Sequence, residues 1–220
     1  MQPSRIAPAP WSLTGNGFVL LYHIPAAFNH RFSFMADYQK AGYKGGIGAV
    51  MLVDYKSSDV GPYYELLYIP GLFYIGGKLT FSVSKIYVSS YDSLWNAREN
   101  WAIPKELAQF KVTELKDGSH VFRVEQENQK FFEVALKPKG WQFPFTSKLL
   151  PLSRITQQNQ LGDLLLTPIT VKGQVRFCSS KIMYSNPDFF PPVSQLKPFV
   201  TLNITDFLMI FSVAKNLKSL

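Results

Sequence analysis

The chain has 220 residues, of which 46% are hydrophobic and 17% are charged, and its formal net charge is +8 at pH 7. This composition excludes a disordered chain and suffices for a buried core, so we expect a single domain over residues 1–220. The basic residues are scattered rather than clustered. That distribution argues against a nucleic-acid partner and favours small anionic molecules.

The first third of the chain is expected to consist of extended segments joined by turns. Prolines at positions 3, 8 and 10 predict an extended arm over residues 1–16, followed by a buried strand at residues 18–24. Residues 26–46 fit a short helix or strand and then a glycine-rich loop. Further strands are predicted at residues 47–55, 63–69 and 79–88.

The pattern changes after residue 90. Asp92 or Ser93 is placed to cap a short helix that carries Arg98. Pro104 then either ends regular structure or opens a helical turn over residues 105–108. Beyond it, with a hairpin turn at Asp117-Gly118, strands are predicted at residues 110–115, 120–124, 131–136, 161–171, 174–179 and 201–214.

So many strands with so few helices predict a mainly β fold of the β-rich α+β kind. We expect an antiparallel sheet that curls into a closed or cone-shaped barrel with few short helices. Such a barrel can hold a small ligand in its interior. The aromatic run Phe189-Phe190-Pro191-Pro192 fits either an interface between copies of the chain or a loop packed on its own barrel.

The cellular setting is expected to be the cytoplasm. Cys178 is the only cysteine, which excludes an internal disulfide and fits a reducing compartment. The first residues have no apolar stretch typical of a secretory signal, and no apolar run approaches the ~20 residues of a membrane helix. We therefore expect a soluble protein that does not bind membranes.

Metal and serine chemistry find little support in the sequence. The three histidines are not spaced as ligands of one metal ion, and there is no cysteine pair or Asp-x-Asp cluster. There is also no Gly-x-Ser-x-Gly motif and no phosphate-binding loop. We therefore expect no metal and no cofactor.

Lys105 and Glu65 are the remaining candidates for chemistry. Lys105 directly follows a proline in apolar surroundings, where a lysine can lose its proton and act as a nucleophile, although most lysines are solvated surface groups. Glu65 lies in a predicted strand among aromatic and aliphatic residues; it carries protons if it points inward and is merely solvated if it points outward. Arg98 and Glu99 fit an ion pair at a helix end.

Three segments together resemble the acetoacetate decarboxylase superfamily. They are Ile86-Tyr87-Val88, then Ala97-Arg98-Glu99, then Pro104-Lys105-Glu106-Leu107. The family's glutamate lies about forty residues before its lysine, as Glu65 does before Lys105. The specific motifs are confined to residues 63–110, while the resemblance covers most of the chain.

The resemblance implies a cone-like β-barrel and a lysine that forms a Schiff base with a keto acid. By matching positions, Lys105 is the Schiff-base lysine, Glu65 is the acid/base or orienting carboxylate, and Arg98 and Glu99 support the lysine's loop. The imine nitrogen then serves as an electron sink for decarboxylation or for related aldol or dehydratase-type chemistry. Members of the family commonly form homo-oligomers.

Two departures leave alternatives open. Glu106 stands where the family's decarboxylases have a second lysine, and a carboxylate facing Lys105 raises the pKa of its amine instead of lowering it. Residues 11–17 also lack the arginine expected on the substrate side. The chain is therefore either a Schiff-base enzyme acting on a keto acid, or a non-catalytic barrel that binds a small apolar or enol-type ligand and pairs Lys105 with Glu65 or Glu106.

Overall fold

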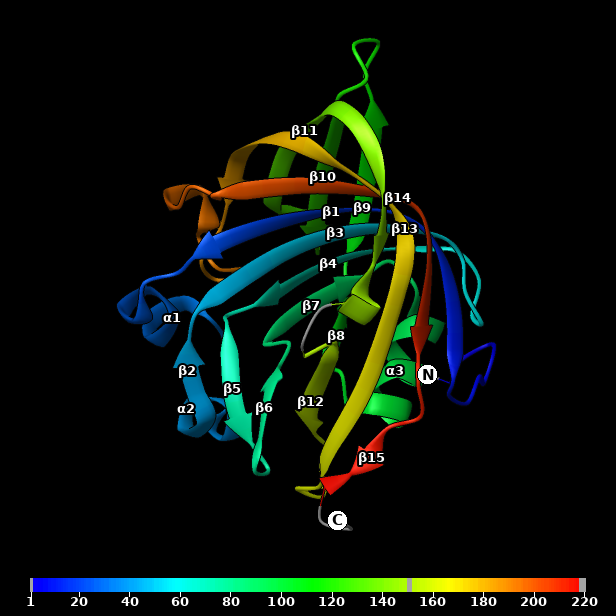
Figure 1. The fold of residues 1–220 in the computed structure, drawn as a ribbon, viewed down its shortest axis with the longest axis vertical. Helices are drawn as coiled ribbons and strands as arrows, with labels where there is room; N and C mark the ends of the chain where they lie inside the picture. The colour runs from blue at the N-terminus through cyan, green and yellow to red at the C-terminus, as the bar shows by residue number, and fades with distance from the viewer. Residues whose placement is uncertain (1, 150–151, 218–220) are drawn as a thin grey trace.

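A computed structural model describes residues 2–149 and 152–217 of the chain (Figure 1). Its helices are α1 (Ala26–Phe32), α2 (Asp37–Gly42) and α3 (Tyr91–Trp101), with short 3-10 turns η1 (Ser147–Leu149) and η2 (Val193–Gln195). Its strands are β1 (Trp11–His23), β2 (Tyr43–Gly45), β3 (Ile47–Ser57), β4 (Tyr63–Ile69), β5 (Leu72–Ile75), β6 (Lys78–Phe81), β7 (Lys85–Val88), β8 (Lys105–Leu107), β9 (Gln109–Glu114), β10 (His120–Gln126), β11 (Gln129–Thr146), β12 (Arg154–Gln158), β13 (Leu164–Ser185), β14 (Val200–Phe211) and β15 (Lys215–Asn216).

Within the described residues the strands form one 15-stranded sheet, whose main path runs β2-β5-β6-β12-β13-β14-β1-β3-β4-β7-β8. The long strands curve around a common interior, and α1 and α2 lie on the other side of the view from α3 (Figure 1). The expected β-rich, cone-like fold with few helices is confirmed. The sheet is open, with β2 and β8 at the ends of the path, and it is mixed, because β8 runs parallel to β7 and β12 runs parallel to β6.

Strands β3 and β4 and the second half of β1 are largely buried on both faces, which explains their nearly continuous apolar sequences. On β4, Leu66 and Tyr68 pack with the β10–β11 hairpin in one core. Leu67 and Ile69 point to the other face, where a second core surrounds a cavity. Alternation along a strand therefore divides the interior into a solid half and a hollow half.

Several predicted boundaries were wrong. β1 begins at Trp11, so the arm is shorter than residues 1–16, and the predicted strand at 79–88 is two strands, β6 and β7. Residues 161–179 do not hold two strands, because β13 runs unbroken from Leu164 to Ser185 with a register shift between Lys172 and Gln174. Such a bulge bends a long strand without ending it.

The region around α3 also differs from expectation. The helix is capped by Ser90, whose hydroxyl accepts a hydrogen bond from the Ser93 backbone N–H at 3.3 Å, rather than by Asp92 or Ser93. Residues 105–107 form β8 instead of a helical turn. The aromatic run at 189–192 packs on its own domain, since Phe190 is fully buried against Tyr68 and Phe132.

No helix in the described part of the chain combines the length and the apolar character needed to span a membrane.

Candidate active site

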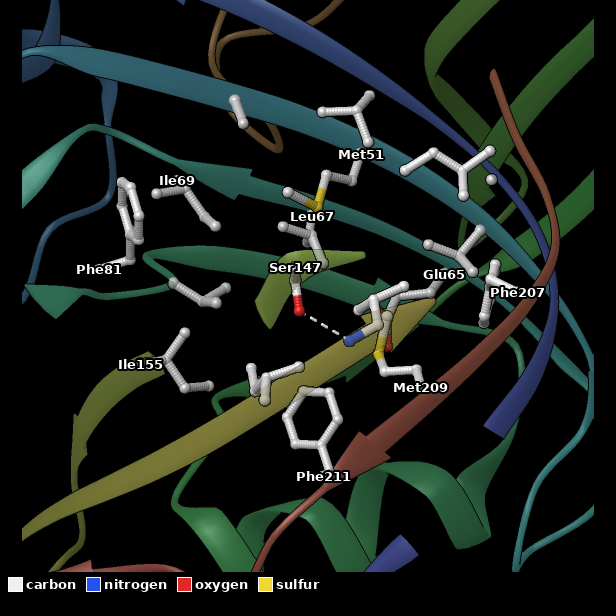
Figure 2. Close-up of a pocket in the computed structure, with 18 of the residues that line it drawn as sticks. Met51, Glu65, Leu67, Ile69, Phe81, Ser147, Ile155, Phe207, Met209 and Phe211 are labelled. Carbon is white, nitrogen blue, oxygen red and sulfur yellow. Dashed lines mark hydrogen bonds between the residues drawn. The ribbon is translucent and has the colours of Figure 1, made fainter. Parts of the chain in front are cut away.

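The hollow half of the interior holds a cavity of about 410 Å³. Its walls come from strands β1, β3, β4, β7, β13 and β14, and aliphatic and aromatic side chains make up most of the lining. Figure 2 shows Met51, Leu67, Ile155 and Met209 around this space, with Glu65 among them. A pocket of this size with a few convergent polar groups is the usual form of a small-molecule site.

Lys105 enters the cavity from β8, the last strand of the sheet path. Pro104 ends the preceding irregular segment, and β8 then pairs in parallel with β7, where Lys105 lies opposite Ile86. Successive residues of a strand point to opposite faces, so Lys105 points inward and Glu106 outward. The Lys105 side chain is only 5% exposed.

The Lys105 ammonium is held by three side chains. Its Nζ lies 2.8 Å from Oε2 of Glu65 and donates hydrogen bonds to the hydroxyls of Ser93 at 3.0 Å and Tyr63 at 3.4 Å. Ser93 comes from α3, whereas Glu65 and Tyr63 lie two residues apart on β4 and share its inner face. The amine therefore has a complete polar shell at the edge of an apolar cavity.

Glu65 points inward, which is one of the two orientations that its sequence surroundings left open. Its side chain is 5% exposed and lines the cavity, and the Tyr55 hydroxyl donates a hydrogen bond to its Oε1 at 3.2 Å. Each carboxylate oxygen thus has a partner: Tyr55 on one side and Lys105 on the other. Buried carboxylates need this degree of pairing to stay charged.

The resting protonation state of Lys105 follows from two opposing effects on its pKa. Burial alone lowers the pKa of the amine, but the neighbouring Glu65 carboxylate, with Tyr63, raises it above the ordinary lysine value. Burial raises the pKa of Tyr63 to about 12, and burial followed by the charge of Glu65 raises the pKa of Tyr55 well above its usual range. At neutral pH Lys105 is therefore held as an ammonium beside Glu65, and Tyr55 and Tyr63 are neutral phenols.

Arg98 supports the backbone at Lys105. Its Nε and Nη2 both donate to the Lys105 carbonyl oxygen, at 3.0 and 2.5 Å. This clamp joins the last turn of α3 to β8 and fixes the strand from which the amine projects. Arg98 therefore acts on the position of the lysine and not on the cavity itself.

Glu99 and Glu106 lie away from the cavity. Glu99 is exposed on α3. Glu106 forms an ion pair with Lys85 of β7, with 2.6 Å between Oε1 and Nζ, and its side chain is 37% exposed. Of the five residues singled out in the sequence, the structure thus brings together Glu65, Lys105 and the Arg98 clamp.

Three polar neighbours of Lys105 and Glu65 were not singled out in the sequence: Tyr55, Tyr63 and Ser93. Tyr63 had a usable signal, because it precedes Glu65 by two residues in a predicted strand and so shares its face. Tyr55 and Ser93 meet the pair only through tertiary packing. Within the described residues, no group of three or more His, Cys, Asp or Glu side chains could hold a metal ion.

Solved structures with a similar fold include acetoacetate decarboxylases, an enzyme described as similar to them and one further biosynthetic enzyme. The acetoacetate decarboxylase from Legionella pneumophila matches with a TM-score of 0.66 at 13% identity, over 95% of this chain and 87% of that one. An acetoacetate decarboxylase-like enzyme from Sphingomonas wittichii RW1 matches with a TM-score of 0.68 at 9% identity, over 96% and 94%. The enduracididine biosynthesis enzyme MppR, in complex with pyruvate, matches with a TM-score of 0.66 at 11% identity, over 96% and 91%.

No curated protein matches the sequence significantly. The family model for acetoacetate decarboxylase, in contrast, matches residues 42–167, which is more than half of the chain and includes both Glu65 and Lys105. The resemblance predicted from the three short segments is therefore confirmed. The chain belongs to the acetoacetate decarboxylase family.

Proposed function

We propose that this protein is an enzyme in which Lys105 forms a Schiff base with a keto acid and removes its carboxyl group. The observation that carries the proposal is the buried pair of Lys105 and Glu65 at the edge of an apolar cavity, with 2.8 Å between Nζ and Oε2. The family and the fold support it. Related aldol or dehydratase-type chemistry uses the same imine and differs in the step that follows.

The first step is a proton transfer within the pair. The resting ammonium cannot attack a carbonyl, and its pKa is raised above the ordinary value. When a substrate excludes water, the uncharged pair becomes more favourable in the apolar cavity, and Glu65 accepts the proton from Lys105. Glu65 thus acts as the base that frees the amine.

The freed amine then attacks the ketone carbon of the substrate. The resulting carbinolamine loses water, with the proton on Glu65 going to the departing hydroxyl, and leaves a cationic imine. The bond to the carboxyl carbon breaks, carbon dioxide departs, and the electron pair moves into an enamine. A proton then adds to the carbon that has lost carbon dioxide. Hydrolysis of the imine by one water releases a ketone and restores Lys105.

The neutral hydroxyls of Tyr63 and Ser93 supply hydrogen bonds around the reacting nitrogen. Both lie within hydrogen-bond distance of Nζ, at 3.4 and 3.0 Å. Donors already in place at the site where an oxygen becomes negative stabilise the carbinolamine without rearrangement. Acetoacetate decarboxylase is a known case of a lysine activated by burial or by a cationic neighbour. In this chain Glu106 points outward and pairs with Lys85. Burial is therefore the effect that lowers the pKa of Lys105, and Glu65, which raises that pKa, contributes as the acceptor of the proton.

The test is borohydride trapping with acetoacetate and a panel of 2-keto and 3-keto acids, read by intact and peptide mass spectrometry. We expect a reduced adduct on the peptide that contains Lys105 and none in Lys105→Met. The matched control Lys85→Met removes a lysine outside the cavity and should trap like the unaltered protein. Absence of adduct with every acid, from folded protein across a pH series, contradicts the proposal.

The second candidate function is a non-catalytic barrel that binds a small apolar ligand. The raised pKa of Lys105 favours it, because a lysine that stays protonated in an ion pair is a structural group. In that case Lys105→Ala keeps ligand affinity within about tenfold, or ~1.4 kcal/mol. An enzyme loses all turnover with the same change.

Self-association is also part of the proposal. The antiparallel pair of strands β11 and β13 exposes large apolar side chains, among them Trp141, which is 85% exposed, and Phe177 at 61%. Exposed apolar side chains on one pair of strands favour contact with another protein surface. Analytical ultracentrifugation should show a species larger than the 25.0 kDa monomer, and a monomer at all concentrations contradicts this part of the proposal.

A further inference from the structure

The cavity is larger than a small keto acid requires. Its volume of about 410 Å³ lies in the range of pockets that enclose drug-sized ligands, from roughly 300 to 1,000 Å³. Acetoacetate is one of the smallest 3-keto acids and leaves most of such a space unfilled. Apolar walls contribute to binding only where apolar ligand surface replaces water. The walls of this cavity are therefore suited to a ligand with more apolar surface than acetoacetate.

The Lys105–Glu65 pair and its two tyrosines lie together at one end of this space. Glu65, Lys105, Tyr55 and Tyr63 contact one another there. The polar side chains elsewhere in the lining are hydrogen-bonded to backbone groups: Ser147 to the Val171 N–H, Ser153 to the Ser147 carbonyl and Arg154 to the Leu79 carbonyl. Apart from these three side chains, the rest of the lining is mainly aliphatic and aromatic.

The apolar part extends along the strands away from the reactive pair. On β4, Glu65, Leu67 and Ile69 point into the cavity in turn, and a strand rises ~3.3 Å per residue, so about 13 Å separates the first from the last. Met51 and Ala49 of β3 lie beside Leu67 and Ile69 and also line the cavity. Figure 2 shows Ile69 and Phe81 across the pocket from Glu65.

We propose that the substrate is a 3-keto acid with a long apolar tail on its ketone carbon. The carboxylate-bearing end lies at Lys105, and the tail runs along β3 and β4 past Met51 to Ala49 and Ile69. This inference rests on the proposed Schiff-base function and names its substrate class. The reaction consumes one proton, releases carbon dioxide and yields the methyl ketone that carries the same tail.

The energetics of burial predict how strongly the tail acts. Each methylene that moves from water into an apolar site contributes roughly fourfold in affinity until the cavity is full. Four added methylenes therefore contribute on the order of a hundredfold. Selection in this site depends on tail length, because the carboxylate and ketone are the same in every member of the series.

The first experiment measures competition for borohydride trapping among acetoacetate, 3-oxohexanoate, 3-oxooctanoate and 3-oxodecanoate. We expect 3-oxooctanoate to exceed acetoacetate by on the order of a hundredfold at low concentration. Equal trapping of all four acids at Lys105 overturns the tail site and leaves the Schiff-base function standing.

The second experiment shortens the cavity. Ala49→Phe places a ring at the far end of the apolar part, so the preferred acid should become shorter. Leu161→Phe, in an exposed loop where the side chain is 84% exposed, adds the same ring outside the cavity and should keep the original order of acids. An unchanged order in folded Ala49→Phe contradicts the assignment of the tail site.

The third experiment needs neither a variant nor a covalent step. Calorimetry on the unaltered protein with 2-pentanone, 2-heptanone and 2-nonanone measures tail binding directly. Affinity that rises with length, without any trapped adduct in the first experiment, supports the tail site and overturns the Schiff-base function. No rise with length overturns the tail site, whatever the trapping shows.

Discussion

Glu65 and Lys105 form an ion pair across a strand that carries neither of them. Glu65 is on β4, Lys105 is on β8, and β7 pairs with both strands. The two side chains meet, with 2.8 Å between Nζ and Oε2, because both project from the same face of the sheet. The pair therefore joins the last three strands of the sheet path as well as forming the site.

Removing one partner should destabilise the fold more than removing both charges. Lys105→Met leaves the Glu65 carboxylate buried without its cation, which costs about 3–5 kcal/mol in the free energy of unfolding. The double variant Glu65→Gln with Lys105→Met removes that charge and should recover a large part of the loss. Urea unfolding of Glu65→Gln, of Lys105→Met and of the double variant measures the difference in the free energy of unfolding. A double variant less stable than Lys105→Met contradicts the buried pair.

The Glu65 charge should set the pH at which Lys105 reacts. Burial lowers the pKa of Lys105 and the Glu65 carboxylate raises it, so Glu65→Gln leaves burial as the dominant effect and the pKa falls. The midpoint of borohydride trapping against pH should therefore move to lower pH, even if the maximal rate drops with the loss of the base. Glu106→Gln, whose carboxylate pairs with Lys85 outside the cavity, should leave the midpoint unchanged.

Arg98 should matter for stability and Glu99, its neighbour on α3, should not. Arg98→Ala removes both hydrogen bonds to the Lys105 carbonyl and should cost about 1 kcal/mol or more in the free energy of unfolding, with slower trapping of keto acids. Glu99→Ala changes an exposed side chain and should stay within about 0.5 kcal/mol. Urea unfolding and trapping rates of the two variants test this; equal effects contradict the role of Arg98.

Stability should be lost at alkaline pH. The pKa of Lys105 and that of Tyr63, which burial raises to about 12, both lie above their ordinary values. A group with a raised pKa in the folded state contributes stability that is complete below its unfolded pKa and disappears as pH rises through its folded pKa. The temperature at the midpoint of thermal unfolding should therefore decrease once the pH exceeds about 10. Tyrosinate absorbance that develops at pH 10 in folded protein, to the extent expected for all eleven tyrosines, contradicts this expectation.

The local sequence pattern predicts a strand correctly where one set of neighbouring strands pairs with the whole segment. Residues 63–69 were predicted with the bounds of β4 itself, because aromatic and aliphatic residues, interrupted only by Glu65, fill the segment between two turns. The strand predicted at 79–88 was split, because Ser82 leaves the ladder to bind the side chains of Gln39 and Gln157, while β7 joins β4. Alternation alone cannot reveal a change of pairing partner in mid-segment.

The site could be predicted in part for the same reason. Lys105 and Glu65 were identified from their apolar surroundings and from the spacing shared with the family, and Glu65 does point inward. The direction of Glu106 was not predictable, because the segment after Pro104 fitted a helical turn as well as a strand. Parallel pairing with β7, a contact distant in sequence, turned Glu106 outward to Lys85.

The Lys105 amine is held by a short, nearly self-contained stretch of the chain. β7, α3 and β8 follow one another directly, and within this stretch Ser93 contacts the Lys105 amine while Arg98 fixes the Lys105 backbone. Glu65 and Tyr63 come from a separate strand and control the charge of the amine. Mutation can therefore retune the acidity of the lysine, or the space in front of it, without moving the lysine. The surroundings of Lys105 can thus vary independently of the segment that holds it.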